Sequence, residues 1–194
     1  MTTTKKHTDE RVTAADFAGH CSESTAWQIL KEMSGQLLES KQGVFNPYLV
    51  KIGDNGHFSL TASDTQVNGF DAPEIATDLR PESATVWSLG ASLFYIVMGR
   101  QVMNGKGGNG QTPTSRLPYI RSEWPALSEL VQQCLQYAPE KRPSLKDVYD
   151  TAKQNHERCL NDIKRGPKFK PAAQTQAGDG NIKEKELAFW PETM

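Results

Sequence analysis

The chain has 194 residues, of which 37% are hydrophobic and 8% aromatic, and this size and composition suit one domain with flexible ends. Its 22 lysines and arginines are balanced by 23 acidic residues, and both signs are interspersed. We therefore expect neither nucleic acid nor an anionic membrane as a partner. The longest apolar stretch, 86–98, is shorter than the about 20 residues that span a bilayer. The polar N-terminus does not resemble a signal peptide, and a cytoplasmic protein is expected.

Two helices are predicted in the first forty residues. Residues 1–12 are polar and expected to be disordered, whereas Thr13 and Asp16 fit a capping box that opens a short helix through Phe17. A longer helix is predicted over residues 24–40, because apolar residues recur there at steps of three and four. The recurring positions are Ala26, Trp27, Leu30, Met33, Leu37 and Leu38.

A hairpin and a buried helix follow. Residues 48–52 and 57–61 flank Gly53-Asp-Asn-Gly56, whose Asn-Gly pair supplies the positive φ of a tight turn. Residues 62–84 are rich in Asp, Pro and Thr and are expected to be irregular. Residues 86–98 are apolar on nearly every side, which is typical of a helix in the middle of a domain.

Two further helices complete the predicted domain, which extends over residues 13–165. One is marked by apolar residues between Leu127 and Leu135, and the other opens with the capping box of Ser144 and Asp147. Residues 166–194 are expected to be a flexible tail with a short apolar motif. The predicted fold class is mainly α (α+β).

Cysteine and histidine spacing offers no metal site or nucleophile. The three cysteines are far apart without any CxxC, and we expect buried, reduced thiols. They are Cys21, Cys134 and Cys159. The four histidines lack motif neighbours and are expected on the surface or on helix faces. They are His7, His20, His57 and His156.

Short motifs in chain order resemble the C-terminal lobe of protein kinases. Residues 70–74, FDAPE, resemble the Ala-Pro-Glu motif that closes the activation segment, and 86–90, VWSLG, resemble the start of the buried central helix. Residues 139–143, PEKRP, resemble the motif before the last kinase helix. The hairpin 48–61 occupies the position of the kinase hairpin between the catalytic loop and the magnesium loop. The resemblance, over about residues 22–155, implies a kinase C-lobe-like helical domain with a small β-hairpin and no N-lobe.

The family implies a role for one pair of residues. Glu74 ends the Ala-Pro-Glu motif and Arg142 lies in the PEKRP motif, and in kinases these positions form an ion pair. Arginine suits this role because its planar fork binds a carboxylate bidentately. We therefore expect Glu74 and Arg142 to form a structural ion pair.

The residues that transfer phosphate in kinases are missing. Only about 25 residues precede the helix at 24–40, so no N-lobe with its Gly-rich loop and lysine is expected. No His-Arg-Asp loop precedes the hairpin, and Asn46 lacks the catalytic Asp that would accompany a magnesium ligand. Asp64 stands two positions late for the other magnesium ligand, and Thr85 replaces an Asp that braces the catalytic loop. We expect no enzyme activity, nucleotide, cofactor or metal.

A glycine motif at 105–110 matches G-x-G-x-x-G but does not follow a strand or open a helix. The context therefore favours a flexible loop over a phosphate-binding loop.

Kinase C-lobes without an N-lobe form the KIND (kinase non-catalytic C-lobe) group of protein-interaction modules, which this chain resembles. It departs from them in keeping residues 140–143 close to true kinases, so an independent truncation stays open. The resemblance implies a non-catalytic module or scaffold that binds another protein. Two alternatives are a nucleotide-dependent transferase, or partial kinase completed in trans, and an inhibitor- or immunity-like kinase mimic.

The predicted tail carries one apolar motif, residues 186–191, ELAFWP. Aromatic anchors dominate binding energy where they dock. Leu187, Phe189 and Trp190 are therefore candidates either to hold the tail on the domain or to bind a partner. The other interpretation is a chance cluster on a frayed end.

Overall fold

The computed structural model describes residues 12–40, 45–61, 67, 69–75, 82–102 and 120–165. This part of the chain forms a mainly helical domain of four α-helices with a small two-stranded antiparallel sheet, so the predicted class is confirmed. The elements are η1 (Ala14–Phe17), α1 (Glu23–Ser40), η2 (Pro47–Leu49), β1 (Val50–Ile52), β2 (Phe58–Leu60), α2 (Glu82–Met98), α3 (Pro125–Cys134), η3 (Pro139–Lys141) and α4 (Leu145–Arg165), where η marks a 3₁₀-helix.

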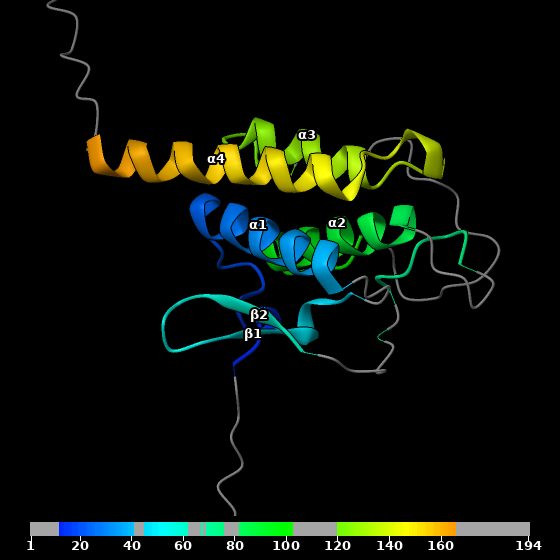
Figure 1. Cartoon of the computed structure of the whole chain (residues 1–194), viewed down its shortest axis with the longest axis horizontal. Helices are drawn as coiled ribbons and strands as arrows, with labels where there is room; N and C mark the ends of the chain where they lie inside the picture. Colours follow the sequence, from blue (N-terminus) through cyan, green and yellow to red (C-terminus); the bar gives the residue numbers. More distant parts are fainter. Residues whose placement is uncertain are drawn as a thin grey trace, which may run out of the picture.

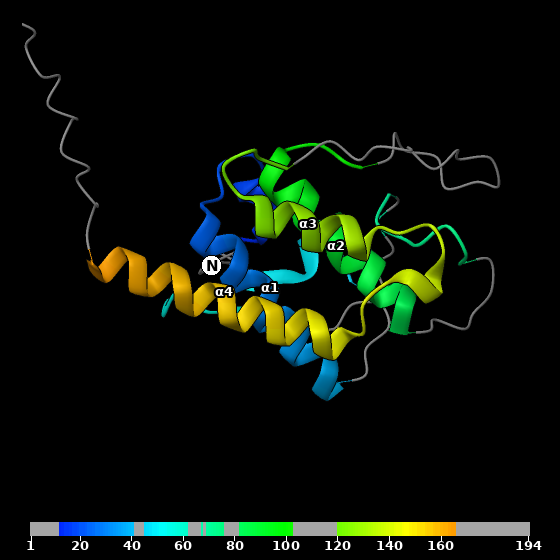
Figure 2. The same cartoon turned by 90° about the horizontal axis from the view of Figure 1, so that it is seen from above.

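The elements lie in three layers (Figure 1). Helices α3 and α4 form the upper layer, α1 and α2 the middle one, and the hairpin lies below α1. Seen from above, α3 lies over α2 while α4 crosses α1 (Figure 2). Helix α1 is therefore covered by α4 on one side and by β2 on the other.

Helix α2 forms the centre of the domain, buried without interruption from Ala84 to Phe94. It begins at Glu82, so the predicted irregular segment 62–84 is wrong at its end. The polar first turn concealed the start of the helix from its apolar pattern. Gly90 lets α3 approach closely, since an added Cβ would lie 2.7 Å from the Cβ of Cys134.

Both predicted capping boxes form, but one begins an α-helix and the other a 3₁₀-helix. Ser144 and Asp147 bond reciprocally, with the Asp147 amide donating to the Ser144 hydroxyl at 3.1 Å and that hydroxyl donating to the Asp147 carboxylate at 2.6 Å. They start the 21-residue helix α4. Thr13 and Asp16 are also bonded, but they open only the four-residue 3₁₀-helix η1.

The hairpin forms as predicted, with Ile52 opposite Phe58. Gly56 has a φ of +75° in its turn, the conformation for which glycine is favoured. The outer edge of β1 is covered by the N-terminal segment, because the Ile52 amide donates to the Val12 carbonyl at 3.2 Å. Covered edges prevent pairing with other chains.

The cysteines of the described residues are free thiols. Cys21 and Cys134 are buried, and burial raises the pKa of each to about 12, while Cys159 is half-buried. Among the described residues, none of the helices combines the length and apolar character needed to cross a membrane.

Candidate functional site

Residues 69–75, which contain the Ala-Pro-Glu motif, are held at both ends. At the first end the buried Phe70 ring contacts Tyr95 of α2 edge-on, with ring centroids 5.7 Å apart. It also contacts Tyr48 of η2, at 6.4 Å. The Ile75 amide then donates to the Ala72 carbonyl in a turn, which brings Glu74 to the start of α2.

Glu74 and Arg142 form a bidentate ion pair at the other end of this segment. Nη1 of Arg142 donates to Oε1 of Glu74, and Nη2 donates to Oε2 at 2.9 Å. The arginine side chain is fully buried, whereas that of Glu74 is 26% exposed. The structure therefore brings together the two residues that the kinase resemblance pairs.

Every N–H donor of Arg142 has an acceptor. Besides the two bonds to Glu74, Nη1 donates to the Ser83 carbonyl at 2.9 Å and Nη2 to the Tyr137 carbonyl at 3.2 Å. Nε donates to the Gln136 carbonyl at 2.7 Å. A guanidinium has five such donors, so this buried charge is fully hydrogen-bonded.

Arg142 thereby joins segments that lie far apart in the sequence. Its guanidinium stands 4.9 Å from the centre of the Trp87 ring, a cation–π contact with α2. The carbonyls of Gln136 and Tyr137 belong to the connection between α3 and η3. Close by, the Glu82 carboxylate of α2 accepts from the Leu145 amide at 2.8 Å and so holds the first residue of α4.

The Glu74–Arg142 pair holds chain segments together, and we call these two residues the clamp. Glu74 and Arg142 use their polar atoms on each other and on backbone carbonyls, which leaves no donor of Arg142 for a substrate. No group of three or more histidine, cysteine or acidic side chains placed to hold a metal occurs among the described residues.

Two other residues that the sequence analysis compared with kinase positions, Asn46 and Thr85, lie in the interior of the domain. Asn46 is buried, and its amide oxygen accepts from the Tyr48 amide at 3.1 Å, which caps η2. Thr85 is buried in the first turns of α2. Asp64, the glycine motif at 105–110, and the tail residues Leu187, Phe189 and Trp190 lie outside the described residues.

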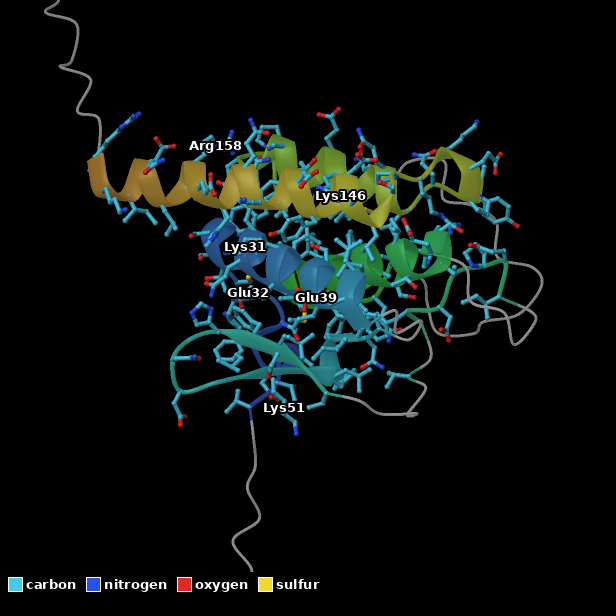
Figure 3. The ribbon with its side chains drawn as sticks, viewed as in Figure 1. Lys31, Glu32, Glu39, Lys51, Lys146 and Arg158 are labelled. Atoms are coloured by element: carbon cyan, nitrogen blue, oxygen red, sulfur yellow. The ribbon has the colours of Figure 1, made fainter. Side chains whose placement is uncertain are left out.

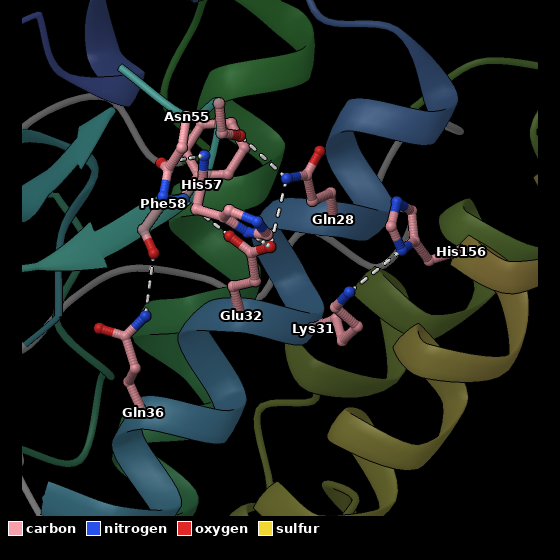
Figure 4. A network of polar contacts seen from close by, with 9 residues as sticks. Gln28, Lys31, Glu32, Gln36, Asn55, His57, Phe58 and His156 are labelled. Atoms are coloured by element: carbon pink, nitrogen blue, oxygen red, sulfur yellow. Dashed lines mark hydrogen bonds and ion pairs between the residues drawn. The ribbon is translucent and has the colours of Figure 1, made fainter. Parts of the chain in front are cut away.

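Sequence reasoning missed a polar network on α1 that holds the hairpin (Figure 4). Glu32 accepts from the Phe58 amide at 2.7 Å and from Nδ1 of His57 at 2.8 Å. Gln36 accepts from the Leu60 amide at 2.8 Å and donates to the Phe58 carbonyl at 3.0 Å. Polar residues four apart on an otherwise amphipathic helix were the only signal for this network.

Burial opposes ionisation of Glu32, but the hydrogen bonds it accepts outweigh this effect. Donation from the Phe58 amide, His57 and Gln28 holds the pKa of the Glu32 carboxyl below its ordinary value. The network therefore contains a charged carboxylate at neutral pH.

His156 lies buried on the inner face of α4, which is the helix-face position, and not the surface position, of the two that the sequence allowed. In Figure 4, Lys31 of α1 reaches toward this ring from the opposite side of the α1–α4 contact. The Lys31 ammonium donates to Nδ1 of His156 at 3.2 Å, which requires a neutral ring. Burial, and then the charge of Lys31, lower the pKa of His156.

A shallow groove of about 400 Å³ lies between α1, α4 and the hairpin. Figure 3 shows Lys31, Glu32 and Glu39 along α1 on this side of the molecule. The groove is open and lined by charges of both signs, and Tyr149 of α4 forms its wall. These features do not define one ligand.

No known protein-family model matches the sequence.

Proposed function

We propose that this chain is a non-catalytic protein-interaction domain with the fold of a protein kinase C-lobe, acting in the cytoplasm. The observation that carries this proposal is the Glu74–Arg142 pair. The kinase resemblance requires these two residues to meet, although 67 residues separate them in the sequence, and the bidentate contact agrees with that requirement.

The surroundings of the pair support the same proposal. The carboxylate follows the Ala-Pro motif, and the guanidinium lies over Trp87 of the buried central helix. The hairpin precedes both in the chain, as in a kinase. Three of the four recognised motifs thus contribute a residue to one clamp, namely Glu74, Trp87 and Arg142, which is harder to explain by chance than any one motif alone.

The residue types before the hairpin support a domain without catalysis. Phosphoryl transfer needs a catalytic Asp and two magnesium ligands beside the hairpin. The sequence before the hairpin, GVFNPY at 43–48, contains none of the His-Arg-Asp loop. Asn46, the one candidate magnesium ligand there, is buried as a cap of η2.

The experiment is affinity capture with the full chain, followed by identification and purification of the captured protein. Titration of the two purified proteins by calorimetry should give a saturable heat that magnesium and ATP leave unchanged. The complex is then incubated with magnesium and ATP and weighed by mass spectrometry. No saturable binding would refute the interaction domain. A mass gain of one phosphate on either protein, absent from each protein alone, would favour a kinase completed in trans.

A further inference from the structure

The face of α4 that contacts α1 continues beyond the end of that contact. Val148, Ala152 and His156 are buried at steps of four residues. Cys159 is half-buried at the next position of this face, and Ile163, four residues later, is 66% exposed. The neighbouring Leu160 is 40% exposed. The apolar face is therefore continuous with an established helix–helix interface but lacks a described partner over its last two turns.

The last two turns of α4 lack a described partner because α1 begins beside Arg158 and does not extend along them. Its first residue, Glu23, approaches Arg158 with its Oε1 3.5 Å from Nη2. Residues 160–165 are all exposed. Figures 1 and 2 both show this end of α4 projecting past the start of α1. Seven residues of helix beyond Arg158 amount to about 10 Å.

A second copy of the chain does not suit this patch. Leu160, Ile163 and the half-buried Cys159 offer far less than the roughly 800 Å² that each partner buries in a stable complex. A segment of the same chain needs much less area, because a tether raises its effective concentration to the order of millimolar.

The sequence after α4 provides such a segment. Leu187, Phe189 and Trp190 are its three large apolar residues, and Glu186 and Glu192 stand on either side of them. The 20 residues at 166–185 can extend to about 70 Å, more than enough to return to α4.

Charge favours the same match. Arg158, Lys164 and Arg165 are exposed around the patch, and Arg158 is labelled on this part of α4 in Figure 3. The same helix end also carries the exposed Glu157 and Asp162, and Arg158 already pairs with Glu23, so the basic groups left to meet the acidic pair of the segment are Lys164 and Arg165.

We propose that residues 186–192 dock on the Leu160–Ile163 face of α4 within the same molecule and extend the layer that α1 begins. The apolar side chains cover the two exposed residues, and the flanking glutamates face the basic side chains. This inference does not depend on the proposed function.

The test uses the full chain labelled with 5-fluorotryptophan and observed by ¹⁹F NMR. The chain has four tryptophans, and the Trp190→Phe variant assigns the resonance of Trp190. We expect the ¹⁹F chemical shift of Trp190 in the full chain to differ from that in the free peptide 186–192. We also expect it to be the same in H₂O and in D₂O, because docking removes the ring from solvent. The double variant Leu160→Ser/Ile163→Ser should return both quantities to the values of the free peptide. Because both residues are exposed, the domain should remain folded.

The control is Tyr137→Ser, which removes another exposed large side chain at a distance from the end of α4. It should leave the Trp190 resonance unchanged. A full-chain resonance equal to that of the free peptide would overturn the proposal, as would a shifted resonance that ignores the double variant. A shift that grows over a hundredfold range of protein concentration would also overturn it, in favour of a second copy.

Discussion

The Glu32 carboxylate of α1 accepts a hydrogen bond from the backbone amide of Phe58, the first residue of β2, at 2.7 Å. One turn later, Gln36 bonds the Leu60 amide and the Phe58 carbonyl along the same strand edge. Side chains of a helix thus take the positions that a third strand would fill. A two-stranded hairpin is marginal alone, so its stability depends on this attachment.

Replacing Glu32 should loosen the hairpin. Glu32→Ala leaves the Phe58 amide without its acceptor, and we expect a loss of about 1–3 kcal/mol in the free energy of unfolding. Urea denaturation measures it. The matched control is Glu39→Ala, an exposed carboxylate on the same helix, which should change stability by less than about 0.5 kcal/mol. Equal effects of the two substitutions would contradict the role of Glu32.

The Glu74–Arg142 pair should show strong coupling. Arg142→Ala removes five hydrogen bonds and the contact with Trp87, whereas Glu74→Ala leaves a buried guanidinium with one acceptor residue fewer. Each should cost on the order of 3 kcal/mol. The double variant should be about as unstable as Arg142→Ala alone, because Glu74 has lost its partner there. Thermal or urea unfolding tests this, with the exposed Glu140→Ala as control, and simple additivity would argue against the clamp.

Acid should destabilise the protein in two separable steps. The folded pKa of His156 lies below 6.5, so the unfolded chain binds the proton more readily and stability falls as pH drops below that value. His156 faces Lys31 and Glu32 of α1 and its neighbour Glu157. Glu32 has a folded pKa below 4.5, so its contribution is lost only at lower pH.

Urea unfolding at a series of pH values should resolve the two steps. His156→Gln should remove the step just below pH 6.5, and Glu32→Gln should reduce the one below pH 4.5, to which Asp147 also contributes because hydrogen bonds with Ser144 lower the pKa of its carboxyl. If His156→Gln leaves the upper step in place, another group causes it.

Gly90 should not tolerate a methyl group. The new Cβ in Gly90→Ala would lie 2.7 Å from the Cβ of Cys134, so overpacking of about 1–3 kcal/mol should exceed the gain of about 1 kcal/mol in helix propensity. Gly35→Ala on α1 is the matched control, since its Cβ would lie 3.2 Å from the end of the Tyr149 ring, which can shift. Differential scanning calorimetry should give a lower Tm for Gly90→Ala only.

The periodicity of the sequence predicted the existence of all four helices. Helix α2 was recognisable because residues such as Leu89 and Phe94 leave no polar side, and α4 because Ser144 and Asp147 mark its start. The start of α2 was misplaced because its first turn is polar, and the Glu82 carboxylate in that turn has its partner at Leu145, 63 residues later. Local patterns do not report such distant partners.

The sequence predicted the Glu74–Arg142 pair but not the roles of Glu32 and His156. Glu74 and Arg142 came from two motifs, but periodicity alone would have left both as surface charges. Nothing local distinguishes Glu32 from Glu39, since both are acidic residues of one helix, and only the hairpin brought against α1 gives one of them a role. His156 was likewise hidden, because the ammonium that meets its ring comes from α1, 125 residues earlier.

The central claim, a kinase-like lobe without kinase chemistry, is tested most directly by melting the full chain with and without magnesium and ATP. A ligand at 100 times its dissociation constant stabilises a protein by about 2.7 kcal/mol, which raises Tm by several degrees in a domain of this size. Because no His-Arg-Asp loop precedes the hairpin and Asn46 is buried as a cap of η2, we predict the same Tm at every ATP concentration up to millimolar levels. A saturable rise in Tm with ATP would contradict the account.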